Sequence, residues 1–295
     1  MRESWHEFFA DSPDVLKTER CGQTVVPVRD FLIGADEFII MAGPCSVETE
    51  AQLLATACHV RGSGARVLRG GAFKPRSSPY AFQGLGLQGL KLLARARQET
   101  GLAIVTEVMS EDDVPMVADY ADILQIGSRN MENFSLLEAA ARSGRPILLK
   151  RGMVATIADF LRSAQCVLAN GNPNVILCER GIRTFETATR NTFDVAAIAL
   201  LKQISHLPVI ADPSHAAGRR QLVPALARIA VAAEADGLLV EVHPHPDTAW
   251  SDGDQTLDLP SFDAMLASLK PLIALRAPRQ PQSLPERLEL LEAVG

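Results

Sequence analysis

Basic side chains recur in this 295-residue sequence where short apolar runs end. They are Arg69, Lys74, Arg76, Arg129, Lys150 and Arg180, with Arg183 as a further candidate. Arginine forms planar two-pronged hydrogen bonds and lysine offers a point charge, and both suit phosphate or carboxylate groups. Any one of these residues is as readily an ordinary exposed cation. A group that shares one end of a set of strands, however, predicts a site for a highly charged anion.

A second group of residues combines sulfur, nitrogen and oxygen donors. Cys45, His215 and Glu241 lie at the ends of apolar runs, and an aspartate follows in the segment after Glu241. Such a donor set suits a divalent transition metal, although a lone cysteine is more often a small core residue. Two choices stay open: the aspartate is Asp252 or Asp254, and His243 and His245 compete for the nitrogen position.

These side chains need a fold that gathers the ends of many strands. Eight short runs rich in Val, Ile and Leu recur with little alternation, as expected for strands buried on both faces. The runs are Phe38–Ala42, Arg66–Leu68, Ala103–Glu107, Ile123–Ile126, Pro146–Lys150, Val175–Cys178, Val209–Ala211 and Leu238–Val242. Helical patterns between them include Ala51–Val60, Leu87–Gln98, Ser135–Arg142, Thr156–Leu168, Val195–Ile204 and Leu222–Ala233. Eight strand–helix units predict an α/β fold, the (β/α)8 TIM barrel, whose strands all end at one active-site face.

An open, doubly wound sheet is the main alternative to the barrel. That fold usually has fewer strands and a Gly-x-Gly-x-x-Gly turn after the first strand. Here the turn reads Gly43-Pro44-Cys45-Ser46, which lacks that fingerprint. In a closed barrel the eighth strand lies beside the first, so the donors on these strands are expected to be neighbours.

Two extensions flank the predicted barrel, which covers residues 37–276. Residues 1–36 form an N-terminal extension, in which Thr24–Ile33 is a candidate hairpin at the barrel floor. Residues 277–295 form a C-terminal tail that begins with a Pro-rich stretch and continues with a helix-capping pattern.

Composition excludes several classes of protein. Lys plus Arg is 29 and Asp plus Glu is 35, which gives a net charge of −6, and aromatic residues make up only 5%. An acidic chain with few aromatic residues is a poor nucleic-acid binder. No uncharged apolar run reaches the ~18 residues of a membrane span, and the acidic N-terminus is unlike a signal peptide. Five scattered cysteines without a Cys-x-x-Cys pair favour a reducing cytoplasm.

Seven motifs follow one another along the chain in a recognisable order. They are Gly43–Glu48, Arg69–Pro79, Gln125–Asn130, Leu149–Gly152, Cys178–Glu186, Asp212–His215 and Val240–Pro244. Together they resemble the 3-deoxy-D-arabino-heptulosonate 7-phosphate (DAHP) synthases, most closely the type I beta branch, over roughly Val25 to Leu275. The resemblance implies a transferase that condenses phosphoenolpyruvate with erythrose 4-phosphate to give DAHP and phosphate, the first step of the shikimate pathway. It also implies a divalent metal ion, with Mn²⁺, Fe²⁺, Co²⁺ and Zn²⁺ as candidates.

The resemblance also assigns residues. The implied metal ligands are Cys45, His215, Glu241 and Asp252, which selects Asp252 over Asp254. The residues implied for phosphoenolpyruvate are Arg69, Lys74, Arg129, Lys150 and Arg180, with Gln125 beside them. Erythrose 4-phosphate is expected at Lys74, Pro75, Arg76 and Ser77, with the last two on its phosphate.

The chemistry of the reaction suggests further roles. A metal near the aldehyde oxygen can stabilise the developing alkoxide, which makes Cys45 and His215 part of the catalytic apparatus. Lys74 lies between both expected substrate sites and is the first candidate proton donor. Glu107 is a candidate for orienting or activating the water that adds to C2 of phosphoenolpyruvate.

Two alternatives to this function differ in class. The sister enzyme 3-deoxy-D-manno-octulosonate 8-phosphate synthase has an Ala-Asn pair where this chain has Pro75 alone between Lys74 and Arg76, and the shorter loop favours the four-carbon sugar. A non-catalytic barrel scaffold is the other alternative, although every motif residue is present.

Regulation and assembly are also predicted. Members of this branch often carry an N-terminal regulatory domain, and residues 1–36 are fewer than the ~50 that a domain usually needs. We therefore expect an enzyme that aromatic amino acids do not inhibit in cis, and a homodimer or homotetramer.

Overall fold

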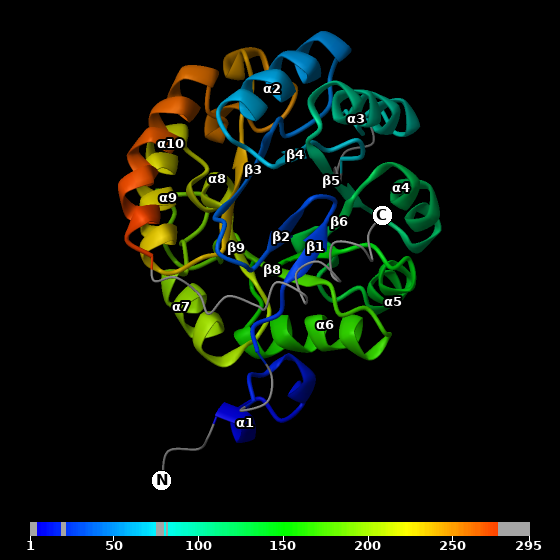
Figure 1. Cartoon of the computed structure of the whole chain (residues 1–295), viewed down its shortest axis with the longest axis vertical. Helices are drawn as coiled ribbons and strands as arrows, with labels where there is room; N and C mark the ends of the chain where they lie inside the picture. Colours follow the sequence, from blue (N-terminus) through cyan, green and yellow to red (C-terminus); the bar gives the residue numbers. More distant parts are fainter. Residues whose placement is uncertain (1–4, 19–21, 75–79, 81, 277–295) are drawn as a thin grey trace.

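A closed barrel of eight parallel strands forms the centre of the computed structural model, which describes residues 5–18, 22–74, 80 and 82–276 (Figure 1). The strands follow one another around the barrel in chain order, and the last, β10, pairs with the first, β3. They are β3 (Ile39–Gly43), β4 (Val67–Arg69), β5 (Ala103–Val108), β6 (Ile123–Ile126), β7 (Ile147–Lys150), β8 (Val175–Glu179), β9 (Val209–Ala211) and β10 (Gly237–Glu241). The predicted TIM barrel is confirmed, and each strand boundary differs from the prediction by at most one residue.

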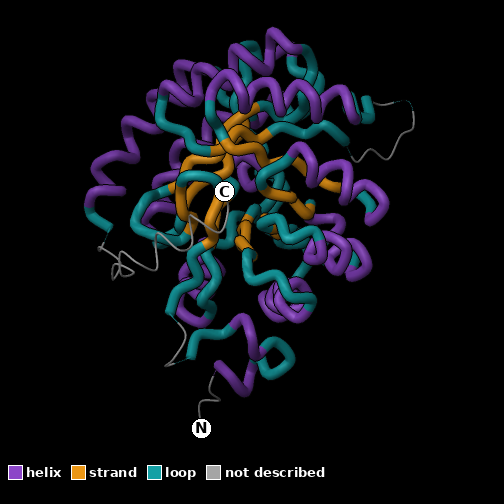
Figure 2. The backbone as a smooth tube through the Cα atoms, turned by 45° about the vertical axis from the view of Figure 1, so that its right-hand side comes forward, coloured by secondary structure: helices purple, strands orange, loops and turns teal. Residues whose placement is uncertain are grey.

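Helices cover the outside of the barrel, as Figure 2 shows in a view turned by 45° from that of Figure 1. In chain order they are α2 (Glu50–Gly62), α3 (Leu87–Thr100), α4 (Val114–Tyr120), α5 (Phe134–Arg142), α6 (Ile157–Ala169), α7 (Val195–Ile204), α8 (Pro213–Ala217), α9 (Val223–Ala232) and α10 (Leu259–Ala274). Several begin at side-chain caps. Thr156 and Asp159 form a reciprocal capping box at α6, and Asp258 accepts a hydrogen bond from the backbone N–H of Ser261 at α10.

Each strand buries both of its faces, and β3 shows why the runs lack alternation. Ile40 and Ala42 pack outward in the core shared with the helices, whereas Ile39 and Met41 point into the barrel interior. Since neither face meets water, every position favours an apolar side chain.

The N-terminal residues include a short hairpin that packs on one end of the barrel. Strand β1 (Val26–Val28) pairs antiparallel with β2 (Phe31–Ile33), and the hairpin lies across the barrel in the view of Figure 1. Its apolar side chains share a core cluster with the first residues of four barrel strands, Ile39, Val67, Ala103 and Ile123. The hairpin therefore covers the end where the strands begin, opposite to the end that carries the candidate site.

Short segments lie at the two ends of the chain. Helix α1 (Trp5–Phe8) precedes the hairpin, and the predicted tail at 277–295 lies outside the described residues. Within the ranges given above, no helix combines the length and apolar character needed to cross a membrane.

Gly43 offers a test of how tightly β3 and β4 are joined. Its φ is +154°, and an added Cβ would lie 2.1 Å from the carbonyl oxygen of Arg69 and 2.9 Å from Cδ1 of Leu68. We expect Gly43→Ala to lower the free energy of unfolding by about 2 kcal/mol or more, because backbone atoms must move apart. Urea denaturation measures this. The control is Gly62→Ala at the end of α2, where a Cβ meets nothing within 4 Å; equal losses in both variants would contradict the prediction.

Candidate active site

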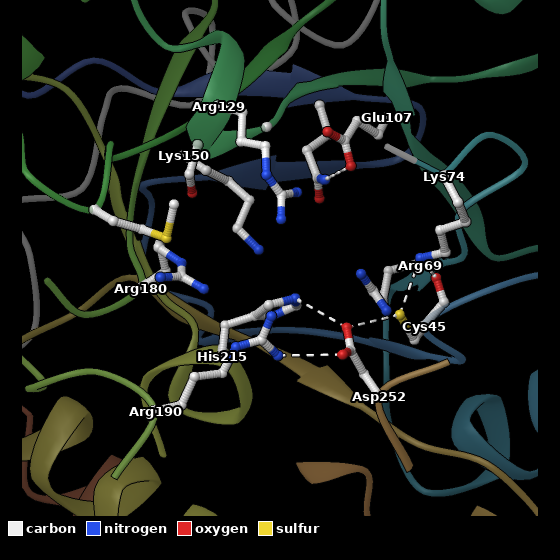
Figure 3. Close-up of a pocket in the computed structure, with 14 residues that line it drawn as sticks. Cys45, Arg69, Lys74, Glu107, Arg129, Lys150, Arg180, Arg190, His215 and Asp252 are labelled. Atoms are coloured by element: carbon white, nitrogen blue, oxygen red, sulfur yellow. Dashed lines mark hydrogen bonds and ion pairs between the residues drawn. The ribbon is translucent and has the colours of Figure 1, made fainter. Parts of the chain in front are cut away.

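A cavity opens at the end of the barrel where the strands finish (Figure 3). Most of its side chains come from the last residues of strands or from the loops that follow them. It is lined by Cys45, Arg69, Lys74, Glu107, Gln125, Gly127, Ser128, Arg129, Lys150, Met153, Arg180, Arg190, His215 and Asp252. Eight segments that are distant in sequence therefore meet at one mouth, as the barrel geometry requires.

Cationic side chains dominate the lining. Arg69, Lys150 and Arg180 are 4%, 4% and 3% exposed, whereas Arg129 is exposed to solvent. The Nε atoms of Arg69 and Arg180 are buried and have no hydrogen-bond partner among the described residues. Burial is the largest influence on Arg180 and lowers its pKa. Because unpartnered buried donors are costly, this part of the cavity is suited to an anion that supplies acceptors.

The buried carboxylate of Asp212 contacts both a lysine and a histidine of the cavity lining. Lys150 Nζ donates to Asp212 Oδ2 at 2.5 Å, and the same oxygen lies 2.8 Å from His215 Nδ1. Burial alone would raise the pKa of Asp212, but the neighbouring His215 and Lys150 hold it well below its usual range. An ionised Asp212 beside Nδ1 leaves His215 Nε2 directed toward the other candidate ligands.

Four candidate metal donors lie close together beside Arg69 and Lys74. Cys45 Sγ and one carboxylate oxygen each of Glu241 and Asp252 lie within 4.8 Å of one another. His215 Nε2 lies 3.6 Å from Glu241 Oε1 and 4.0 Å from Asp252 Oδ2. The thiol donates to Asp252 Oδ2 at 3.3 Å. The structure thus brings together the thiol, the imidazole and both carboxylates, and this donor set indicates a metal site.

Burial and charge act differently on these donors. Burial, together with Glu241, raises the pKa of the Cys45 thiol to about 11. Burial would raise the pKa of both carboxyls, but His215 lowers it in each, helped by Arg69 at Glu241 and by Arg190 at Asp252. Burial lowers the pKa of His215. At neutral pH the site therefore offers two carboxylates and a neutral imidazole, with the thiol still protonated.

Lys74 extends from the loop after β4 to the metal donors. Its Nζ donates to the carbonyl oxygen of Cys45 and lies 2.9 Å from the sulfur. Gly71 leaves room for this side chain, because a Cβ there would lie 2.8 Å from Nζ. Lys74 therefore stands at the boundary between the cationic side and the metal donors.

Glu107 lies at the upper right of the cavity in the view of Figure 3, above Lys74. Its Oε2 accepts a hydrogen bond from Gln125 Nε2 at 3.3 Å. Its Oε1 fills the space where a side chain at Gly127 would begin, 1.9 Å from the position of an added Cβ. Gln125 and Gly127 therefore hold the carboxylate at the cavity wall.

Several residues predicted for the site do not line the cavity or lie outside the described residues. Pro75, Arg76 and Ser77 lie outside the described residues. Arg183 is exposed and does not line the cavity. Among the rival ligands, Asp254 is exposed and lines a separate surface hollow with Arg219 and Arg220. The rivals His243 and His245 also stay away from the cavity lining.

Three residues near the donors carry contacts that the sequence did not predict. Arg190 lines the cavity and donates to Asp252 Oδ1 at 3.2 Å and to Gln255 Oε1 at 2.6 Å. Gln255 in turn donates to Glu241 Oε2 at 2.6 Å. Asp212 entered the sequence analysis only as the first residue of the Asp212–His215 motif, with no role of its own. Arg190 was the one with a detectable signal, since it is a further cation in the long segment that follows β8.

Comparisons with known proteins agree with this geometry. The chain is 52% identical over 249 residues to phospho-2-dehydro-3-deoxyheptonate aldolase of Thermotoga maritima, covering 84% of this chain and 74% of the relative. It is 34% identical over 284 residues to 2-dehydro-3-deoxyphosphooctonate aldolase of Syntrophotalea carbinolica, covering 90% and 97%.

Solved structures are similar as well. A crystal structure of the Thermotoga maritima aldolase (DAHP synthase) matches with a TM-score of 0.86 and 50% identity, over 88% of this chain and 76% of that chain. A truncated form of the Thermotoga maritima synthase matches with a TM-score of 0.84 and 46% identity, over 90% and 97%. The model of the DAHP synthetase I family matches residues 16–274, and the chain therefore belongs to that family.

Proposed function

We propose that this protein is a DAHP synthase, which condenses phosphoenolpyruvate with erythrose 4-phosphate and releases phosphate. The observation that carries the proposal is the arrangement at one cavity. The thiol of Cys45, the imidazole of His215 and the carboxylate of Asp252 share the cavity with buried cations (Figure 3), and Glu241 lies beside these donors. The two substrates together bring two phosphates and one carboxylate. This demand matches the described part of the cavity lining, in which six side chains are cationic and two, Glu107 and Asp252, are carboxylates.

Phosphoenolpyruvate is assigned to the cationic side of the cavity. Lys150 and Arg180 are buried there, and the unpartnered Nε atoms of Arg69 and Arg180 supply donors for its oxygens. Arg129, which is exposed, can reach the anion from the mouth. Because arginine and lysine here are largely shielded from water, their attraction for phosphate is stronger than at an open surface.

The thiol, the imidazole and the two carboxylates of the candidate metal site fit a divalent ion of the first transition series. The thiol selects against Mg²⁺ and Ca²⁺, while the imidazole and carboxylates accept Mn²⁺, Fe²⁺, Co²⁺ or Zn²⁺. Cys45, His215, Glu241 and Asp252 would hold it. When bound, such an ion supplies Lewis acidity toward the aldehyde oxygen of erythrose 4-phosphate.

The reaction assigns proton transfers to two side chains. C3 of phosphoenolpyruvate attacks the aldehyde carbon and forms the new carbon–carbon bond, while Lys74 donates a proton from Nζ to the former aldehyde oxygen. Water then adds to C2 and gives one proton to Glu107, which leaves a hydroxyl and the phosphate group on C2. Cleavage of the bond between C2 and the bridging oxygen expels phosphate, which takes the hydroxyl proton as the C2 carbonyl forms. Gln125 orients Glu107 through their hydrogen bond.

Phosphate release tests the proposed activity. With Mn²⁺ and both substrates, we expect the purified protein to release phosphate with erythrose 4-phosphate and far less with arabinose 5-phosphate. Cys45→Ala removes a ligand and the group that the metal must deprotonate, so it should lower kcat/KM at least ~100-fold. Faster turnover of arabinose 5-phosphate, the sugar that the octulosonate synthase takes, would favour that enzyme, and no turnover of either sugar would favour a scaffold.

The pH dependence of metal affinity follows from the Cys45 thiol. Its pKa is raised to about 11 by burial and Glu241, so metal binding must displace a proton at neutral pH. His215 has a lowered pKa and displaces none. The logarithm of the affinity should therefore rise by about one per pH unit between about pH 7 and 9. Chelator competition with Co²⁺ measures the slope, Cys45→Ser should flatten it, and a flat wild-type profile would count against the assignment.

We also propose that the protein forms a homodimer or homotetramer through its N-terminal aromatic residues. Trp5 and Phe8 are 48% and 60% exposed, and their rings contact that of Phe9. Such exposed aromatic groups are typical of interfaces. Phe8→Asp should shift the protein to a smaller species in analytical ultracentrifugation, whereas Phe134→Asp on α5 should not. A monomeric wild-type protein would refute this assembly.

A further inference from the structure

A buried hydrogen-bond network lies behind the candidate metal donors. It consists of Ser46, Glu48, His243 and Ser251, which are 1%, 8%, 4% and 6% exposed, and we call it the rear network. None of the four lines the cavity. Two of them follow Cys45 closely in sequence, and the other two belong to the segment after β10 that carries Asp252.

Glu48 is the centre of the rear network. Its Oε2 lies 3.2 Å from His243 Nε2, and its Oε1 accepts the backbone N–H of Trp250 at 2.7 Å. One carboxylate from the segment after β3 thus holds two separate points of the segment after β10. Buried hydrogen-bonding groups are costly to leave without a partner, so these contacts favour the observed path of the segment.

The contacts of His243 settle its protonation and its role. Its Nδ1 accepts the backbone N–H of His245 at 2.9 Å, so this nitrogen carries no proton. Nε2 must then carry the ring proton and donate it to Glu48. Since both ring nitrogens are engaged, His243 is a structural partner of Glu48 and has no free nitrogen for a metal.

A second contact lies immediately beside the ligands. The hydroxyls of Ser46 and Ser251 are 2.8 Å apart, and these residues adjoin Cys45 and Asp252 in sequence. Asp252 itself has φ of +51°, in the left-handed region that a residue other than glycine adopts at a cost. Its surroundings must therefore hold it there. The rear network contacts the two residues that immediately precede this position, Trp250 through its backbone N–H and Ser251 through its hydroxyl.

We propose that Glu48 and His243 are positioning residues that hold Asp252 against Cys45, so that the donor cluster is formed before a metal arrives. The inference rests on the metal site of the proposed function. It assigns a role to the last residue of the Gly43–Glu48 motif and to one of the two rival histidines, neither of which the reaction uses. Preformed ligands bind a metal more tightly because less ordering is needed on binding.

Cobalt binding tests the inference with a matched control. Glu48→Gln is the first test variant. Both partners of Glu48, His243 Nε2–H and the Trp250 N–H, are donors, whereas the glutamine amide has only one acceptor. Its NH₂ group must face one of the two donors, so one of the hydrogen bonds is lost in either orientation. His243→Gln removes the other partner. The control is His206→Gln at the opposite end of β9, because His206 is also buried and bonded through both nitrogens, to Thr24 Oγ1 at 2.6 Å and to the carbonyl oxygen of Asp14 at 2.7 Å. Titration of chelator-stripped protein with Co²⁺, followed by the thiolate–cobalt absorption, gives Kd.

We expect the Kd for Co²⁺ to rise about 10- to 100-fold in Glu48→Gln and His243→Gln, as for other residues that orient metal ligands. His206→Gln should keep the wild-type Kd while losing a similar amount of resistance to urea. Should either test variant fail to fold, Ser251→Ala removes only the hydroxyl contact and should still weaken Co²⁺ binding. Unchanged affinity in the folded test variants, or an equal loss in the control, would overturn the inference.

A second measurement needs no metal. The chain contains two tryptophans, so a Trp5→Phe background leaves Trp250 as the sole tryptophan, which excitation at the red edge of the absorption band selects over tyrosine. Losing the Glu48 contact should make Trp250 more accessible to acrylamide in Glu48→Gln, and His206→Gln should leave quenching unchanged. If wild-type protein gives no thiolate–cobalt absorption, the metal site of the proposed function fails. The quenching then still decides whether Glu48 holds this segment, and unchanged quenching would refute that.

Discussion

Closure of the barrel between β10 and β3 is the constraint on which the candidate site depends. These strands pair in parallel over five residue pairs, ending with Glu241 opposite Gly43. The backbone N–H of Val242 then donates to the carbonyl oxygen of Gly43 at 2.8 Å. In this register Glu241 lies opposite Gly43, which precedes Cys45 by only two residues. The carboxylate and the thiol are therefore neighbours, although nearly 200 positions separate them along the chain. Without closure, the thiol and the carboxylates would belong to opposite edges of a sheet.

Charge balance at the mouth follows from this proximity. Burying a charge is unfavourable unless an opposite charge compensates it. Arg69 donates to Glu241 at 2.8 Å, and Lys150 donates to Asp212, so each buried carboxylate is held ionised by a cation that also faces the cavity. The ionised carboxylates are the form that a metal needs, and the cations keep donors for an anion. One set of ion pairs therefore prepares both halves of the site.

Sequence reasoning succeeded where local chemistry determines structure. Both faces of each strand are buried, so continuous apolar runs marked the strands to within one residue, and the turn after β3 argued for a closed barrel. It failed where long-range packing decides. Arg190 belongs to the irregular segment between β8 and α7, whose path no periodic pattern encodes. His243 could not be separated from His215 by residue type, because only the contacts of Nδ1 and Nε2 show that both nitrogens are engaged.

The anion-binding cations and the candidate metal donors are also coupled electrostatically. Among the described residues, six cationic side chains line the cavity. The carboxylates are fewer: Glu107 and Asp252 in the lining, and the buried Glu241 and Asp212 paired with Arg69 and Lys150. A divalent cation therefore enters a region with excess positive charge. An anion on Lys150 and Arg180 reduces that repulsion. A metal likewise reduces the repulsion that an anion meets from Asp252 and Glu241. Because coupling between two ligands is reciprocal, each strengthens the binding of the other by the same factor. The buried cations and the donor cluster therefore act as one site, and their separation across a single cavity lets two oppositely charged ligands meet in it.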